Sequence, residues 1–288
     1  MKQKYGKLST LIIIVSLSIS GTCAADIQWL PEGSIYPTRF LDPAACQQSL
    51  SILSYTVEDA TQQFMYVPIS LSMRQQFFRL ENNIQQRWEW GMEFSIFTQF
   101  SIVDVGEAYL GGLQNADYRI STMLHYQSGS SSFYRFSLFH QSSHLGDDYI
   151  IRNFIVTPTP NTQNYEQLDF AVTKRFQSWG YYAGGGYNIS PNTVRKRLLV
   201  HAGGDWSHPL KHQPGLALLA GVDVKVYEHN DYAPNIRVGL GFELARQTQT
   251  PLKLLFSWYQ GQLPYSTLEY QKVRLVGLSL IFDVFTGV

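Results

Sequence analysis

His140 and Ser142, two positions apart, are the residues in this chain best suited to chemistry. Alternate residues of a β-strand lie on one face, so an extended segment would place the imidazole beside the hydroxyl. A histidine in that position can act as the general base that activates a serine nucleophile. Such a pair also needs a third group that orients the imidazole.

Asn153 is the residue that we expect in the orienting role. If residues 145–148 form a four-residue turn, antiparallel pairing places Asn153 opposite His140, and cross-strand neighbours share a face. The resulting hypothesis is acyl-ester hydrolysis, with Ser142 as nucleophile, His140 as general base and Asn153 as orienter. It depends on the register, because a slip by one residue turns Asn153 to the other face.

The same segment supports two other interpretations. His144, Asp147 and Asp148 could hold a cation such as Ca²⁺, which prefers carboxylate oxygens. Alternatively, these side chains only anchor a loop, because Asp and Gly are common in turns. Elsewhere, Gly184 to Gly186 lack the spacing and the lysine of a phosphate loop, and we expect them to mark a bend or a close approach in a strand. The sequence indicates no organic cofactor.

The candidate residues belong to one of about twelve segments in which apolar and polar residues alternate. In one of them, Tyr118 and Ile120 alternate with Asp117 and Arg119. A period of two is the signal of a β-strand with one apolar and one polar face. The segments are residues 47–57, 66–80, 86–100, 115–127, 132–144, 165–177, 179–189, 197–208, 215–228, 234–246, 251–262 and 270–284.

Short and long connections alternate along this array. Short ones lie near residues 81–83, 128–130, 178 and 247–249, and long ones at 101–114, 145–164 and 261–270. Short turns at one end and long loops at the other are typical of an outer-membrane β-barrel. A secreted β-sandwich would also alternate, but its strands are usually shorter. The predicted fold is therefore all-β, an antiparallel transmembrane β-barrel of about twelve strands.

The composition favours a membrane barrel over a soluble cytosolic enzyme. Aromatic residues reach 14% of the 288 residues, and only 15% are charged. In soluble domains about a quarter of the residues are charged. Lys and Arg total 22, as do Asp and Glu, so the net charge of zero gives no electrostatic basis for binding nucleic acid.

The N-terminus has the three-part pattern of a secretory signal. Three lysines precede an apolar run over residues 11–19, and small residues end the segment at Ala25, where we place the cleavage site. A lipoprotein anchor at Cys23 is less well supported, because Thr22 stands where a smaller residue is expected. We expect residues 1–25 to be the signal peptide, 26–46 an irregular arm that contains three prolines, and 47–288 the barrel. Export would deliver the chain to the bacterial outer membrane.

Alternation assigns the candidate residues to the membrane-facing side of their strand. Phe136 and Leu138 are apolar, and His140 and Ser142 continue the same face. A strand that leaves the short turn at 128–130 brings this pair to the outer-leaflet end, among membrane lipids. Charges of both signs on the opposite face predict a narrow or closed lumen. The rival hypothesis is a non-catalytic barrel, either a narrow channel or a scaffold that presents its loops, and a homodimer is compatible with both.

Several sequence blocks carry a resemblance to a known family. They are LPEG at 30–33, LDP at 41–43, NADY at 115–118, FHQSSHLGDD at 139–148, YAGGGY at 182–187 and NDYAPN at 230–235. In this order they resemble bacterial outer-membrane β-barrels catalogued as domain of unknown function 1207, over nearly the whole mature chain. This resemblance implies the barrel fold.

A second resemblance is local and chemical. His140-Gln141-Ser142 is similar to the His-x-Ser motif of outer-membrane phospholipase A and of the lipid A deacylases. It implies hydrolysis of lipid acyl esters on the outward wall of the barrel, with Asn153 in the role of the asparagine of the phospholipase. Those families continue the motif with Asn-Gly or Asn-Ala, whereas Ser143 and His144 follow here.

Overall fold

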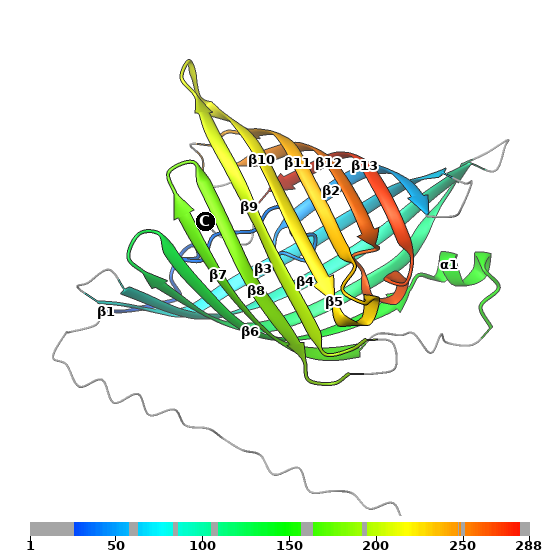
Figure 1. Ribbon diagram of the computed structural model, residues 1–288, viewed down its shortest axis with the longest axis horizontal. Helices are drawn as coiled ribbons and strands as arrows, with labels where there is room; N and C mark the ends of the chain where they lie inside the picture. Colours follow the sequence, from blue (N-terminus) through cyan, green and yellow to red (C-terminus); the bar gives the residue numbers. More distant parts are fainter. Residues whose placement is uncertain are drawn as a thin grey trace, which may run out of the picture.

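Twelve antiparallel strands close into a barrel, and a short thirteenth strand precedes them (Figure 1). The computed structural model describes residues 26–57, 63–82, 86–104, 109–156, 164–191, 195–246, 248 and 251–282, so the predicted signal peptide lies outside the described residues. Within these ranges no helix is long and apolar enough to cross a membrane. The predicted fold, an antiparallel barrel of about twelve strands, is confirmed.

Each barrel strand pairs with the next one along the chain, and the last strand pairs with the first, β13 with β2. The short strand β1 adds to the edge of β3. The strands are β1 (Asp26–Trp29), β2 (Gln48–Val57), β3 (Gln63–Glu81), β4 (Gln86–Asp104), β5 (Tyr109–Ser128), β6 (Ser132–Leu145), β7 (Asn164–Phe176), β8 (Trp179–Asn188), β9 (Leu198–Leu210), β10 (Gln213–Tyr227), β11 (Pro234–Leu244), β12 (Leu252–Gln262) and β13 (Lys272–Phe282).

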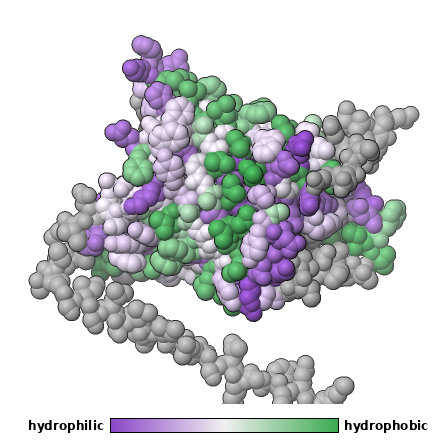
Figure 2. All heavy atoms as spheres, viewed as in Figure 1, coloured by the Kyte–Doolittle hydropathy of each residue, from purple (hydrophilic) through white to green (hydrophobic). Residues whose placement is uncertain are grey.

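Side chains along each strand alternate between the lumen and the membrane. In β6, Arg135, Ser137 and Gln141 are buried, whereas Phe136 and Leu138 are exposed, as the alternation predicts. Figure 2 shows hydrophobic side chains gathered across the middle of one wall, with hydrophilic side chains toward its ends. An exposed apolar belt of this kind is the lipid-facing surface of a barrel.

The two ends of the barrel differ in their connections (Figure 1). At one end, two residues join β7 to β8 and three join β5 to β6. At the other end, the connections contain α1 (Asp147–Arg152), η1 (Glu228–Asn230) and η2 (Ser266–Leu268). Short turns belong to the periplasmic end and long loops to the extracellular end of such barrels.

The predicted long loop at 101–114 is wrong. The ladder between β4 and β5 continues to the pair Asp104 and Tyr109. A bulge between Gln99 and Phe100 shifts the register, which lets the two strands stay paired beyond it. This hairpin therefore extends at the extracellular end as strand rather than as loop.

Beyond its first residues, the N-terminal arm lies inside the barrel. The sequence predicts an irregular arm over residues 26–46. The first residues of the arm differ from this prediction, because they form the strand β1. The following segment crosses the lumen, where the Tyr36 hydroxyl bonds to Thr173 at 2.9 Å and the side chain of Phe40 is buried. The polar interior of the barrel thus supplies partners for a segment whose prolines keep it out of the sheet.

Leu41 and Asp42 anchor the arm by two different means. Leu41 packs onto two lumen-facing glycines, where an added Cβ would lie 2.8 Å (Gly221) and 2.7 Å (Gly239) from its methyl groups. Asp42 forms ion pairs with Lys225 and, at 3.4 Å, with Arg39. Burial alone would raise the pKa of Asp42, but these two cations outweigh it and hold the pKa well below its usual range.

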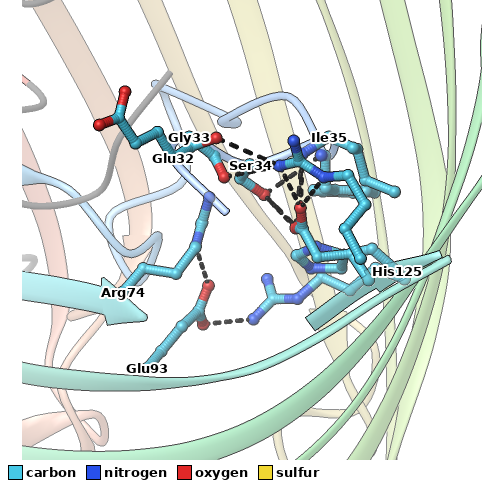
Figure 3. A network of polar contacts seen from close by, with 11 residues as sticks. Glu32, Gly33, Ser34, Ile35, Arg74, Glu93 and His125 are labelled. Atoms are coloured by element: carbon cyan, nitrogen blue, oxygen red, sulfur yellow. Dashed lines mark hydrogen bonds and ion pairs between the residues drawn. The ribbon is translucent and has the colours of Figure 1, made fainter. Parts of the chain in front are cut away.

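Two buried carboxylates organise the lumen near the arm (Figure 3). Glu93 accepts from Arg74 at 2.7 Å and from Arg135 at 2.6 Å. Glu89 accepts from the Ser34 hydroxyl at 3.0 Å, and Arg79 lies 2.6 Å from its other oxygen. Glu89 therefore ties the arm to the barrel wall.

The connection between β12 and β13 folds into the lumen from the extracellular end. Thr267 and Ser143 are buried and hydrogen-bonded to each other. Glu269 pairs with Arg195 at 2.7 Å. Between this connection and the arm, the described residues leave a lumen cavity of about 60 Å³. A cavity of this volume holds a few water molecules at most. The barrel is therefore plugged from both ends.

Candidate active site

His140 and Ser142 lie on the membrane-facing wall of β6, near its extracellular end. His140 is exposed and Ser142 is half-buried, on the face that also carries Leu138. On the neighbouring β5, Ile120 pairs with His140 and Tyr118 pairs with Ser142. The two polar residues therefore stand at the upper edge of an apolar wall.

Glu166 of β7 is the partner of His140. The two residues are cross-strand neighbours, and His140 Nδ1 lies 2.9 Å from Glu166 Oε1. Their side chains are 46% and 43% exposed. A carboxylate on Nδ1 fixes the orientation of the ring and leaves Nε2 for a serine, which is the arrangement found in serine–histidine–acid hydrolases.

The connection that follows β8 holds Glu166 in place. The Ser190 hydroxyl donates to Glu166 Oε2, and the Ile189 N–H donates to the Glu166 carbonyl at 2.8 Å. The N–H of Ser190 donates in turn to Asn188 Oδ1 at 3.0 Å. Three strands, β6, β7 and β8, thus contribute to the orientation of one imidazole.

Asn164 stands beside the serine. It begins β7, pairs with Ser142 and is exposed on the same wall. Among the described residues, Ser142 Oγ and His140 Nε2 have no hydrogen-bond partner, and they are not bonded to each other. Catalytic hydrogen bonds are often long in ligand-free sites and tighten when substrate is bound. Both reacting atoms are therefore available to a substrate.

The assumed register that placed Asn153 opposite His140 is wrong. The connection after β6 is not a four-residue turn, because α1 follows Leu145 and β7 begins only at Asn164. Asn153 lies at the C-terminal end of α1, where its side-chain amide donates to the Tyr149 carbonyl at 2.8 Å. It caps a helix and does not contact His140.

The alternative cation site does not form either. Asp148 Oδ2 accepts the Leu113 N–H at 3.0 Å and so attaches α1 to β5. His144 lies instead against the ring of Tyr118, with ring centroids 5.9 Å apart. The described residues contain no cluster of three or more His, Cys, Asp or Glu side chains that could hold a metal ion. The interaction of Asp148 with the backbone therefore favours the loop-anchoring interpretation.

The sequence contained a signal for Glu166. The apolar residues on the outward faces of β6 and β7 pair as Phe136 with Phe170 and Leu138 with Leu168. Aligning these two apolar runs, without any assumption about the loop, places Glu166 opposite His140. A four-residue turn at residues 145–148 is incompatible with this alignment.

Solved structures of outer-membrane enzymes share the fold. Outer membrane phospholipase A from Escherichia coli superimposes with a TM-score of 0.54 at 10% identity, over 82% of this chain and 90% of that one. An active-site mutant of the same enzyme gives a TM-score of 0.55 at 11% identity, over 88% of this chain and 91% of the other. At such low identity the likeness concerns the fold, which is that of a bacterial outer-membrane β-barrel.

Sequence comparison identifies the family. No curated protein sequence matches the chain. The family described as protein of unknown function (DUF1207) matches residues 14–284, which include all twelve barrel strands and the arm. The chain therefore belongs to the DUF1207 family of proteins.

Proposed function

We propose that this barrel hydrolyses acyl esters of outer-leaflet lipids, with Ser142 as nucleophile, His140 as general base and Glu166 as the group that orients the base. The observation that carries the proposal is the 2.9 Å contact between His140 Nδ1 and Glu166 Oε1 on the lipid-facing wall, with Ser142 two residues further along the same face. Glu166 replaces Asn153 in the hypothesis drawn from the sequence.

In the reaction, His140 Nε2 takes the proton of Ser142 while the serine oxygen attacks the ester carbonyl. Return of that proton to the leaving alcohol completes the formation of an acyl-serine. Water, deprotonated by the same imidazole, then releases the fatty acid and restores the serine. The side-chain amide of Asn164, opposite Ser142, is the proposed hydrogen-bond donor to the carbonyl oxygen as it gains negative charge.

The position of the site supports a lipid substrate. Charged groups on the lipid face of a barrel cost about 2–4 kcal/mol at mid-membrane and little near the interface. His140 and Glu166 lie at the extracellular end of their strands, where the headgroups and ester bonds of outer-leaflet lipids are located.

We further propose that the chain reaches this membrane by signal-dependent export, and that a homodimer is one form in which it works.

The lumen does not support the rival interpretation as a narrow channel. The arm and the connection between β12 and β13 occupy it, and the described residues leave a cavity of about 60 Å³. A non-catalytic barrel would therefore act through its outer surface or its loops, as a scaffold.

Turnover by purified protein in mixed micelles tests the proposal. We expect release of fatty acid from phospholipid or lipid A, and labelling of Ser142 by a sulfonyl fluoride. Ser142→Ala and His140→Ala should each abolish turnover, and the double variant should be no worse than either, because the two residues act as a unit. Ser137→Ala is the matched control, since Ser137 lies on the same strand but is buried on the lumen side.

Folding is monitored in the same samples. A folded barrel resists detergent at room temperature, so unheated and boiled protein should migrate differently on a denaturing gel. Absence of acyl product from all substrates, with and without Ca²⁺, together with an unlabelled Ser142 in folded protein, would overturn the enzymatic proposal and leave the scaffold.

A further inference from the structure

The outer wall directly below His140 and Glu166 is hollowed into an apolar groove of about 640 Å³. The groove lies between two successive rows of cross-strand neighbours. One row contains Leu138 and Leu168, which are the next outward-facing pair below His140 and Glu166. The other contains Phe136 and Phe170, whose ring centroids are 4.6 Å apart.

Gly185 leaves the gap in the lower row. It pairs with Phe170 on one side and with Val200 on the other, at an outward-facing position of β8. An added Cβ there would meet only the Leu199 carbonyl oxygen, at 3.1 Å, so the space outside the backbone is open. The glycine therefore exposes a hollow in a wall where its neighbours carry large side chains.

The flanking glycines have a different role. An added Cβ at Gly184 would lie 2.7 Å from His201 on the lumen side, and one at Gly186 would collide with the side chain of Gln167. The structure thus confirms a close approach inside the barrel for these two residues. Gly185, in contrast, is not required by any contact in the lumen.

We infer that this groove binds one acyl chain of the lipid whose ester bond lies at Ser142, and that Gly185 admits long chains. The inference rests on the proposed function. Four residues along β6 separate His140 from Phe136, which corresponds to about 13 Å at 3.3 Å per residue. One leaflet contributes about 15 Å of the ~30 Å hydrocarbon core. The groove therefore lies at the depth of an outer-leaflet chain attached at the level of Ser142.

The polar neighbours agree with this occupant. Tyr187 belongs to the upper row and pairs with Leu198, and its hydroxyl accepts from Arg197 at 3.0 Å, so the charged group stays at the rim. In the lower row, the Trp90 indole N–H donates to Thr122 Oγ1 at 3.0 Å and presents an apolar ring surface to the groove. Among the described residues that line the groove, only Asp169 is charged, and its carboxylate lies 3.1 Å from the buried ring of His201.

Chain-length selectivity of hydrolysis tests the inference. Wild-type protein should hydrolyse a sixteen-carbon ester in preference to a four-carbon ester. Gly185→Leu should lower kcat/KM for the long ester at least tenfold and leave the short ester within twofold. Ala220→Leu adds the same side chain to an outward-facing position on β10 and should change neither rate.

The outcomes separate the two proposals. Unchanged selectivity in Gly185→Leu, with both esters still hydrolysed, overturns the groove and leaves the proposed function intact. No hydrolysis of any ester by wild-type protein overturns the proposed function instead.

A fluorescence measurement then decides on the groove. Lipids with brominated chains at low mole fraction should quench Trp90 more than Trp258, which lies outside the groove on β12. The two signals are assigned by difference from Trp90→Phe and Trp258→Phe. Gly185→Leu should remove the excess quenching of Trp90. Equal quenching of the two tryptophans in protein that keeps Gly185 would overturn the inference.

Discussion

Carboxylates in the lumen and the carboxylate on the lipid-facing wall have opposite surroundings. In the lumen, the side chain of Glu93 is 5% exposed and lies between Arg74 and Arg135. On the wall, Glu166 is 43% exposed and faces a single histidine that is 46% exposed. Both carboxylates bond to nitrogen at less than 3 Å, so distance alone does not distinguish them.

The difference in burial indicates different roles for the carboxylates of Glu93 and Glu166. A buried carboxylate must be paired, since an unpaired charge in the interior is strongly destabilising. An exposed ion pair contributes only about 0–1 kcal/mol. Stability therefore explains why Glu93 has two arginines, but it does not explain why a glutamate holds a histidine beside a serine at the edge of an apolar wall. The proposed hydrolysis gives this arrangement a role.

The largest effect on stability is expected from a substitution of Glu93 in the lumen. Glu93→Gln removes the carboxylate from Arg135 and should lower the free energy of unfolding by about 3–5 kcal/mol. Glu166→Gln should lower it by no more than about 1 kcal/mol. Denaturant unfolding of both variants in lipid vesicles, followed by tryptophan fluorescence, measures the difference. Equal losses would show that burial does not separate the two regions.

Activity should show the reverse order. Glu166→Gln leaves His140 without a charged orienting group and should lower kcat/KM by about 10²–10⁴-fold, as loss of the acid does in serine hydrolases. Glu81→Gln removes a carboxylate from an ion pair of similar exposure, 41% for Arg87 and 45% for Glu81, far from Ser142, and should leave activity unchanged. A Glu166→Gln variant as active as wild type would exclude Glu166 from the site.

Much of the fold could be predicted from the sequence because a two-residue period is a local signal. Phe136 and Leu138 identify the lipid face of β6, and that alone places His140 and Ser142 on the outer wall. Strand number and the two kinds of barrel end follow from the same pattern. The bulge at Gln99 and Phe100 is not visible in the pattern, so the pattern predicts that the hairpin of β4 and β5 ends too early.

The interior and the third site residue depend on contacts between distant segments. Nothing near Leu41 in the sequence indicates that it packs against Gly221 and Gly239. A turn directly after β6 predicts Asn153 as the partner of His140, whereas Glu166 comes from the far side of α1. Local patterns assign a side chain to a face, but they do not identify its neighbour on that face.

A smaller effect is expected from a substitution that weakens the contact between the N-terminal arm and the barrel wall. Leu41→Ala removes the side chain that fills the space over Gly221 and Gly239, and should weaken docking of the arm by about 2 kcal/mol, the low end for a buried leucine. Cys46, the only cysteine after residue 25, is buried in the arm and reports its release. We expect faster labelling of Cys46 by a maleimide in Leu41→Ala than in wild type. Leu138→Ala, on the lipid face, should leave the labelling rate unchanged.

The smallest effect is expected from acid. The pKa of Asp42 is lowered in the folded protein because Lys225 and Arg39 outweigh the effect of burial. The stabilisation from these ion pairs is therefore complete above the usual Asp pKa of about 3.9 and is lost only as the pH falls through the lower folded value. Protection of residues 34–46 from hydrogen exchange should be the same at pH 7 and pH 5, after correction for the intrinsic rate.

Lys225→Met turns this insensitivity into a test of the ion pairs. With one of its two cations removed, Asp42 keeps the unfavourable effect of burial, so its pKa should rise and protection of the arm at pH 7 should be lower than in wild type. Because protonation relieves a buried carboxylate that has lost a partner, protection in the variant should rise, or stay unchanged, as the pH is lowered from 7 to 5. Lys253→Met removes a lysine that pairs with Glu243 elsewhere on the barrel and serves as the control. If protection of the arm in Lys225→Met equalled that in wild type at pH 7, Asp42 would not be held by its cations, and the apolar contact of Leu41 would be the principal anchor of the arm.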